Sequence, residues 1–288
     1  MGFGQEQGES TEMNLFRIAS DNVNSLEQRG QDLRESNAGN PDALDRIDRF
    51  VQRVQADGRI GVNMRPWILA RFLSRGVYTN IYGWAAEMAA LSGSDAEAFV
   101  GKKLGSYKDK RQAFDSAFED SERFGYGALT IGGAGAEHYG EFCFVIRDAF
   151  AADVKSSAYL RGDSLNDYMT ADGTLLDSKM RQDLAPPSHR HCLALLKHAP
   201  DLGAASDWAA LLCSSSGYIE AIFLPDLKPE DGEEVRVRAS RYRELWDLTF
   251  ESFGRKLAAG ESALQAHFVE VLTELRDRSL PCVEVPQC

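Results

Sequence analysis

The feature that most constrains the fold of this chain is a set of short strand-like segments between two helical regions. The segments are bounded by glycine or turn residues and span 127–133, 139–147, 218–224 and 235–239. Regular crossover helices do not separate them, which favours an α+β fold over a doubly wound parallel sheet. We therefore predict a central antiparallel or mixed sheet, with a helical part before it and helices after it.

Helical periodicity on both sides of the strands defines the expected domain organisation. Residues 41–125 are predicted to be mostly helical, residues 126–240 strand-rich and residues 241–288 helical again, all within one domain. Residues 1–40 are rich in Gly, Gln, Glu, Ser and Asn. We predict a flexible segment there, of a kind that can carry an export signal.

The bulk composition excludes several classes of protein. The 288 residues include 32 Lys and Arg against 44 Asp and Glu, and a net charge of -12 argues against DNA or RNA as partner. No apolar run approaches the roughly 20 residues that span a bilayer, so no membrane partner is expected. Five cysteines without a C-x-x-C pair favour a reducing compartment. The start of the chain lacks the features of a cleaved signal peptide.

Motifs for several kinds of chemistry are missing from the sequence. The densest group of possible metal ligands is "SHRHC", but His189 and His191 would point about 200° apart on a helix, so we assign no metal. Neither a G-x-S-x-G nucleophile turn nor a phosphate-binding P-loop occurs. The glycine-rich stretch 132–140 is better explained as a loop that joins two strands.

Glu220 is unusual because it lies inside the apolar strand "YIEAIFL" (218–224). A single carboxylate at this place suits cleavage of the nicotinamide–ribose bond of NAD, since it can bind ribose hydroxyls and offset the positive charge that develops on the sugar. The alternative is a glutamate that faces solvent on the outer side of a half-buried sheet. We expect NAD to bind in a cleft between the helical N-terminal part and the strands. Ser214, Ser215 and Ser216, just before the strand, could line this cleft or only turn the chain into the strand, and the sequence leaves both open.

Several segments together resemble one bacterial family, although each alone is weak. In order they are "RIGVNMRPWILARFLSRGVYTNIYGW" (59–84), "SERFGYGALTIGG" (121–133), "HYGEFCFVIRD" (138–148), "LRGDSLNDY" (160–168) and "GYIEAIFLPDLKPEDGEEVRV" (217–237). Across residues 58–240 the chain is similar to the effector family that ADP-ribosylates a threonine of host ubiquitin. The resemblance implies a NAD-dependent mono-ADP-ribosyltransferase domain over residues 41–288, with a sheet of that type. It also implies a monomer that is secreted into the host cytoplasm without a signal peptide and blocks ubiquitination.

The resemblance also assigns roles to individual residues. Glu220 takes the place of the catalytic carboxylate, and the residues that would bind NAD are Asn63, Arg65, Tyr78, Tyr82, Tyr126, Asp163 and Ser164. Asn63 and Arg65 lie at a polar strand-to-helix junction suited to a diphosphate. Asp163 and Ser164 match a Gly-Asp-Ser turn that could hold ribose or the nicotinamide amide. The tyrosines would supply an aromatic surface.

Each of these residues also has a purely structural explanation. Asn63 could only cap the following helix and Arg65 could be solvated, whereas Asp163 and Ser164 could form nothing but an Asx turn. The tyrosines could be core residues with bonded hydroxyls. Where the family often has histidine after the asparagine, this chain has Met64. The second functional hypothesis is therefore an inactive NAD- or protein-binding module that acts through its helices.

Overall fold

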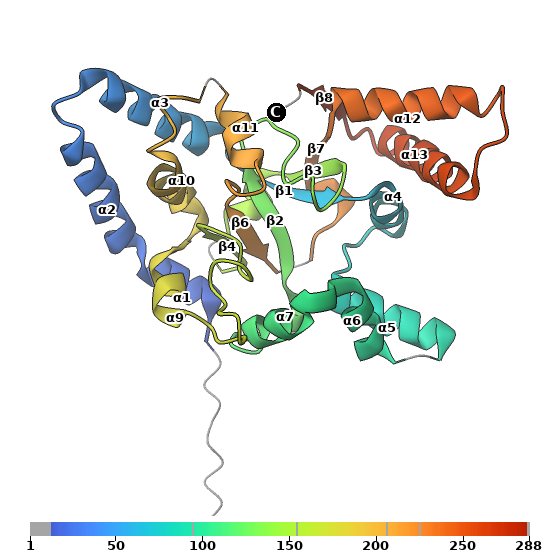
Figure 1. The fold of residues 1–288 in the computed structure, drawn as a ribbon, viewed down its shortest axis with the longest axis horizontal. Coiled ribbons are helices and arrows are strands. Elements are labelled where there is room, and N and C mark those ends of the chain that lie inside the picture. The colour runs from blue at the N-terminus through green and yellow to red at the C-terminus, as the bar shows by residue number, and fades with distance from the viewer. Residues whose placement is uncertain (1–12, 94, 154, 206, 225, 287–288) are drawn as a thin grey trace, which may run out of the picture.

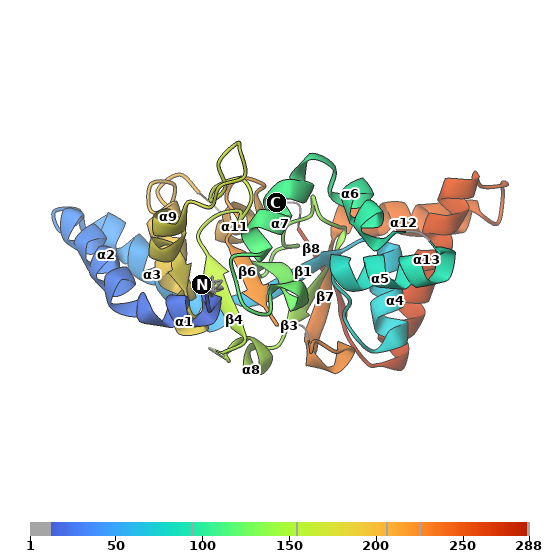
Figure 2. The ribbon, with the colours of Figure 1, turned by 90° about the horizontal axis from the view of Figure 1, so that it is seen from below.

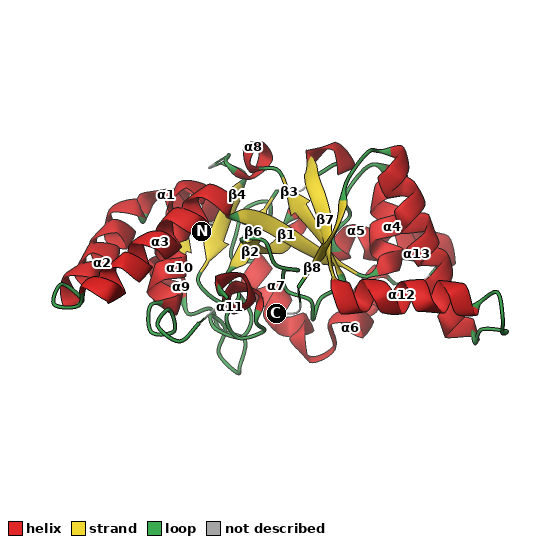
Figure 3. Ribbon diagram, turned by 90° about the horizontal axis from the view of Figure 1, so that it is seen from above, coloured by secondary structure: helices red, strands yellow, loops and turns green. Residues whose placement is uncertain are grey.

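A mixed sheet lies at the centre of the molecule, with helices grouped at both of its ends (Figures 1 and 3). The computed structural model describes residues 13–286 apart from 94, 154, 206 and 225. Its strands are β1 (Arg59–Met64), β2 (Gly125–Thr130), β3 (Phe142–Ile146), β4 (Ser157–Leu160), β5 (Leu184–Ala185), β6 (Glu220–Phe223), β7 (Gly232–Arg238) and β8 (Cys282–Val285). They form one sheet of eight strands within this described part, in the order β5-β4-β6-β2-β1-β3-β7-β8.

Pairing in the sheet is antiparallel except between β7 and β8, so the expected mixed sheet is confirmed. The predicted strands correspond to β2, β3, β6 and β7. Four strands were not predicted. β1 lies within residues 41–125, which were predicted to be mostly helical, because its six residues follow α3 directly and precede α4. β4, β5 and β8 have only two to four residues, and no longer apolar run marks them as the run 218–224 marks β6. β8 also comes from a proline-flanked tail, and it pairs with β7 as the last strand at that edge of the sheet.

Helices flank the sheet along its length (Figure 2). They are α1 (Leu15–Asp21), α2 (Val23–Ser36), α3 (Pro41–Asp57), α4 (Pro66–Arg75), α5 (Ile81–Ser92), α6 (Ala96–Leu104), α7 (Lys108–Asp115), α8 (Asp148–Ala151), α9 (Asp177–Gln182), α10 (Arg190–His198), α11 (Trp208–Cys213), α12 (Ala239–Glu251) and α13 (Ala259–Asp277). The start of α3 is as predicted, with Pro41 in its first turn and the Asn40 side chain accepting a hydrogen bond from the Ala43 amide at 3.1 Å. None of the helices in the described residues is both long and apolar enough to cross a membrane.

The prediction of a flexible segment over residues 1–40 is wrong from residue 13 onward. Asn14 caps α1 by accepting a hydrogen bond from the Arg17 amide at 2.9 Å, and Leu15 and Phe16 are buried in the core. Leu26 of α2 is fully buried as well. The few apolar residues of this polar stretch therefore suffice to fix two helices on the domain. Residues 1–12 lie outside the described residues.

The two faces of the sheet have different surroundings. Ile60, Val62 and Met64 of β1 point into the main hydrophobic core, which also takes in residues of α3, α4, α10 and α13. Because side chains alternate along a strand, Gly61 and Asn63 point to the opposite face. The candidate site lies on that face.

Candidate active site

Glu220 is the first residue of β6, and its position follows from the sheet register. It pairs with Ala128 of β2, which in turn pairs with Gly61 of β1. These three residues therefore lie in one row across the centre of the sheet and share one face. Glu220 is only 4% exposed, so the alternative of a solvent-facing glutamate is wrong.

A cavity of about 400 Å³ opens beside Glu220. Of the residues predicted to form the site, six line it, namely Asn63, Arg65, Tyr78, Tyr82, Tyr126 and Glu220. Asp163 and Ser164 are not part of the cavity wall, but both lie close to Glu220. The structure thus brings the predicted residues into one region of the molecule, although they come from segments up to about 160 positions apart in the sequence.

Ser164 holds the Glu220 carboxylate directly. Its backbone N–H donates to Glu220 Oε2 at 2.7 Å, and the Ser164 side chain is fully buried. Burial raises the pKa of Glu220 to about 7, against the lowering effects of Arg111 and of both the side chain and the backbone of Ser164; Asp163 raises it further. Glu220 therefore changes its protonation state near neutral pH.

Arg111 of α7 is a site residue that the sequence patterns did not reveal. Its guanidinium lies 3.9 Å above the centre of the Tyr126 ring, and Nη2 donates to Ser164 Oγ at 3.2 Å. Arg111 Nη1 contacts Asp115 Oδ1 at 3.4 Å. One side chain therefore fixes a cavity-lining tyrosine and the serine that binds Glu220.

Asp115, one turn after Arg111, anchors two cavity-lining tyrosines. The hydroxyl of Tyr126 donates to Asp115 Oδ1 at 2.7 Å, and the hydroxyl of Tyr82 donates to Asp115 Oδ2. Burial raises the pKa of Asp115, although Arg111 and the two hydroxyls oppose that shift. The rings of Tyr82 and Tyr126 consequently face the cavity, whereas their hydroxyls are already hydrogen-bonded to Asp115.

Tyr78 also lines the cavity but is mainly a core residue. Its ring packs against Phe72 at 6.2 Å and Phe223 at 5.9 Å between ring centres, and burial raises its pKa to about 12. This contact set fits the structural explanation better than a stacking role. Tyr82 and Tyr126 are better placed to meet a ligand.

Asn63 secures the loop of residues 132–140 between β2 and β3. Asn63 Nδ2 donates to the carbonyl oxygens of Ala134 at 2.8 Å and Gly140 at 2.9 Å. Gly135 has a φ of +68°, and a Cβ there would lie 2.3 Å from Asn63 Oδ1, so glycine is required at this close approach. The helix-cap explanation for Asn63 is wrong, since Arg65 is the N-cap residue of α4.

Arg65 and Lys103 are basic residues on the cavity wall with no acidic partner among the described residues. The side chains of both are exposed, and neither forms an ion pair or a side-chain hydrogen bond with any residue that the structure describes. Lys103 Nζ lies 5.8 Å from the centre of the Trp67 ring and 5.6 Å from that of Phe99. The outer part of the cavity wall thus contains two cations, Arg65 and Lys103, and two aromatic rings, Trp67 and Phe99.

Asp163 forms an Asx turn and also binds two tyrosine hydroxyls. Its Oδ1 accepts hydrogen bonds from the backbone N–H groups of Leu165 at 2.9 Å and Asn166 at 2.7 Å. Its Oδ2 accepts from Tyr139 OH at 3.1 Å and from Tyr218 OH. The predicted turn is present, but it has a second set of contacts that the sequence did not indicate.

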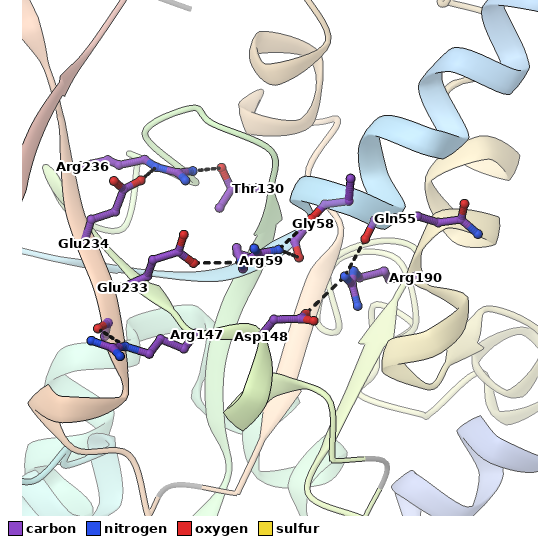
Figure 4. Close-up of polar contacts among 12 residues, drawn as sticks. Gln55, Gly58, Arg59, Thr130, Arg147, Asp148, Arg190, Glu233, Glu234 and Arg236 are labelled. Atoms are coloured by element: carbon purple, nitrogen blue, oxygen red, sulfur yellow. Dashed lines mark hydrogen bonds and ion pairs between the residues drawn. The ribbon is translucent and has the colours of Figure 1, made fainter.

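The far end of β1 carries a separate polar cluster (Figure 4). There Arg59 Nε binds Glu233 Oε2 at 2.9 Å, and Arg147 Nε donates to the carbonyl oxygen of Gly232 at 2.8 Å. These contacts tie β7 to its neighbours. They lie at the end of the sheet away from Asn63 and the cavity.

His189 and His191 lie closer together than predicted. Their ring centres are 5.8 Å apart, because His189 belongs to a 3-10 turn and the α-helical spacing begins only at Arg190. His189 Nε2 contacts Glu27 Oε1 at 3.0 Å, and burial lowers the pKa of His191 to about 4. Among the described residues, no group of three or more His, Cys, Asp or Glu side chains could hold a metal ion.

Neither comparison with known proteins identifies this chain. A search against known protein families found no match. A search of curated protein sequences found none either.

The raised pKa of Glu220 predicts a pH-dependent effect on stability. The folded protein binds the proton of this carboxyl more tightly than the unfolded chain, in which the pKa is 4.5. The protonated carboxyl therefore stabilises the fold fully below pH 4.5, and this stabilisation is lost as the pH rises through about 7. Relative to Glu220→Gln, the wild-type protein should lose about 2.5 kcal/mol of unfolding free energy between pH 5 and pH 8. Urea unfolding of both proteins at the two pH values measures this. An equal difference at both pH values would contradict the burial of an ionisable carboxyl.

Proposed function

We propose that this protein is a NAD-dependent mono-ADP-ribosyltransferase whose acceptor is a threonine hydroxyl of host ubiquitin. The observation that supports the reaction is Glu220, a buried carboxyl at the wall of a 400 Å³ cavity with a pKa near 7. The acceptor is proposed from the resemblance of residues 58–240 to the effector family.

Glu220 would act on the nicotinamide ribose of NAD. In its ionised form it accepts a hydrogen bond from a ribose hydroxyl and offsets the positive charge that develops at the anomeric carbon as the bond to nicotinamide breaks. Ser164 keeps the carboxylate in place through its backbone N–H at 2.7 Å, and Arg111 keeps Ser164 in place. A carboxylate that is buried and held in place needs little reorganisation during the reaction.

The outer part of the cavity fits the rest of the dinucleotide. Arg65 and Lys103 are unpaired among the described residues and can neutralise a diphosphate. Trp67 and Phe99 offer aromatic surface beside Lys103. The cavity volume lies within the usual range for sites of this kind.

Loss of either Arg65 or Lys103 should weaken NAD binding. Arg65→Ala and Lys103→Ala are each expected to raise KM for NAD about tenfold with little change in kcat, because a charged hydrogen bond contributes about 1.5 kcal/mol. Initial rates of nicotinamide release against NAD concentration measure this effect. The matched control is Lys102→Ala, which removes an exposed neighbouring charge that does not line the cavity. An equal rise in KM for the control would show a general charge effect instead.

The experiment that tests the proposed function is the intact mass of ubiquitin after incubation with the protein and NAD. We expect a gain of one ADP-ribose group and release of one nicotinamide per modification. Nicotinamide release without modified ubiquitin would support NAD cleavage and exclude this acceptor. Binding of NAD or ubiquitin with no cleavage would favour the inactive binding module.

A further inference from the structure

Three oxygen atoms meet beside Glu220 without a role in the chemistry described so far. Asp163 Oδ2 accepts hydrogen bonds from Tyr139 OH at 3.1 Å and from Tyr218 OH, and the two hydroxyl oxygens are 3.1 Å apart. Tyr139 and Tyr218 line the same cavity as Glu220. The cluster therefore borders the space in which an acceptor would meet the ribose.

Each member of this cluster is held by a different segment. Tyr218 lies two positions before Glu220, in the segment that leads into β6. Tyr139 belongs to the loop that Asn63 secures on β1. Asp163 is fixed through Oδ1 by the Asx turn, and its own N–H donates to Asp167 Oδ2 at 2.9 Å. The three oxygens are thus brought together by the tertiary fold.

The two tyrosines differ in their access to solvent. Tyr139 is 51% exposed, whereas Tyr218 is 4% exposed. An acceptor side chain that arrives on another protein can reach Tyr139 but not the buried Tyr218. Tyr139 already donates its proton to Asp163, so its oxygen is free to accept a hydrogen bond from an incoming hydroxyl.

The charges around Asp163 come from several elements. His138 stacks on Tyr139 at 4.0 Å between ring centres, and burial lowers its pKa although Asp163 opposes this. Lys197 of α10 lies 5.9 Å from the Tyr218 ring and donates to the Tyr218 carbonyl at 2.6 Å. Glu220 adds a second carboxyl. Asp163 therefore has both a cation and an anion near it.

We propose that Tyr139, backed by Asp163, takes the proton of the acceptor, and that the acceptor is a neutral hydroxyl. This inference rests on the proposed function. The acceptor oxygen forms a bond to C1′ of the nicotinamide ribose, the bond from C1′ to nicotinamide breaks, and its electron pair leaves on neutral nicotinamide. The acceptor proton moves to Tyr139 O while the Tyr139 proton moves to Asp163 Oδ2. A carboxylate acceptor would not need such a route, since it carries no proton.

Glu220 is thereby left with a single task. It stays ionised and binds the ribose. Tyr139 is the catalytic residue that contacts the acceptor, and Asp163 is a positioning residue that receives the proton from Tyr139. Water as an acceptor can pass its proton to neighbouring solvent. NAD hydrolysis should therefore depend much less on this cluster than transfer to a protein hydroxyl.

Two variants test the inference, Tyr139→Phe and Asp163→Asn. Asparagine keeps an oxygen for the two N–H groups of the turn, and Tyr139 is half exposed, so both variants should fold. We expect each variant to lower the ratio of ADP-ribose transfer to ubiquitin over nicotinamide release without ubiquitin at least about 30-fold. Asp167→Asn is the matched control, because it disturbs the same turn without contact to the tyrosines.

A pH series separates a proton-accepting role from a structural one. The deficit of Asp163→Asn relative to wild type should shrink about tenfold between pH 7 and pH 9, as solvent hydroxide replaces the missing base. Equal losses of transfer and hydrolysis, a pH-independent deficit, or full transfer activity in both variants would overturn the inference alone. A wild-type protein that neither releases nicotinamide nor modifies ubiquitin would instead overturn the proposed function.

Discussion

Glu220→Gln is expected to lower nicotinamide release from NAD at least about 100-fold at pH 7.5 without loss of NAD binding. Glutamine has nearly the same shape and can still accept the Ser164 N–H, but it carries no negative charge to offset the developing charge on the ribose. Because the burial of Glu220 raises its pKa to about 7, the wild-type rate should also rise with pH through that value. The variant should lack this rise.

Nicotinamide release by chromatography and NAD binding by calorimetry measure the two parts of this prediction. Glu220→Asp provides a second comparison, since it keeps the charge but withdraws it from the cavity wall by one methylene group. We expect an intermediate loss. Undiminished cleavage in Glu220→Gln would exclude Glu220 as the catalytic carboxylate.

Arg111→Met is expected to lower the free energy of unfolding by about 3 kcal/mol at pH 7. The Arg111 and Asp115 side chains are only 11% and 7% exposed, so the change leaves a buried carboxylate without its cation. It also removes the donor to Ser164 Oγ and the cation above the Tyr126 ring. Activity should therefore fall together with stability.

Urea unfolding measures the effect of Arg111→Met against that of Lys110→Met. The control removes a positive charge from the neighbouring position of α7, where no ion pair forms with the described residues, and should cost less than about 0.5 kcal/mol. Equal stability of the two variants would contradict a buried Arg111–Asp115 pair.

Local sequence patterns predicted the elements of the fold better than their connections. α3 begins at Asn40 and Pro41 as expected, and the strand of Glu220 is present. Those features depend on capping groups and on side-chain alternation within a few residues. The order of the strands depends instead on pairing between distant segments. It is this order that puts Glu220 two strands away from Asn63.

No comparable local pattern marked four further residues near Glu220, namely Arg111, Asp115, Tyr139 and Tyr218. Arg111 and Asp115 are four apart on a helix, a spacing that occurs on many solvent-exposed helix faces. Only the packing of α7 over Tyr126 distinguishes them. Tyr139 and Tyr218 likewise become neighbours through Asp163, and nothing local in either segment predicts that contact.

The position of β6 between β2 and β4 has a consequence for how the chain folds. β6 follows β2 by about 90 residues, so their pairing closes a long loop, and such pairing is slow compared with local contacts. During synthesis the helices before residue 116 and the pairing of β1, β2 and β3 can form while β6 is still unmade. The carboxyl of Glu220 therefore joins its neighbours late, and the newly made chain cannot be competent for NAD cleavage until about three quarters of it is complete.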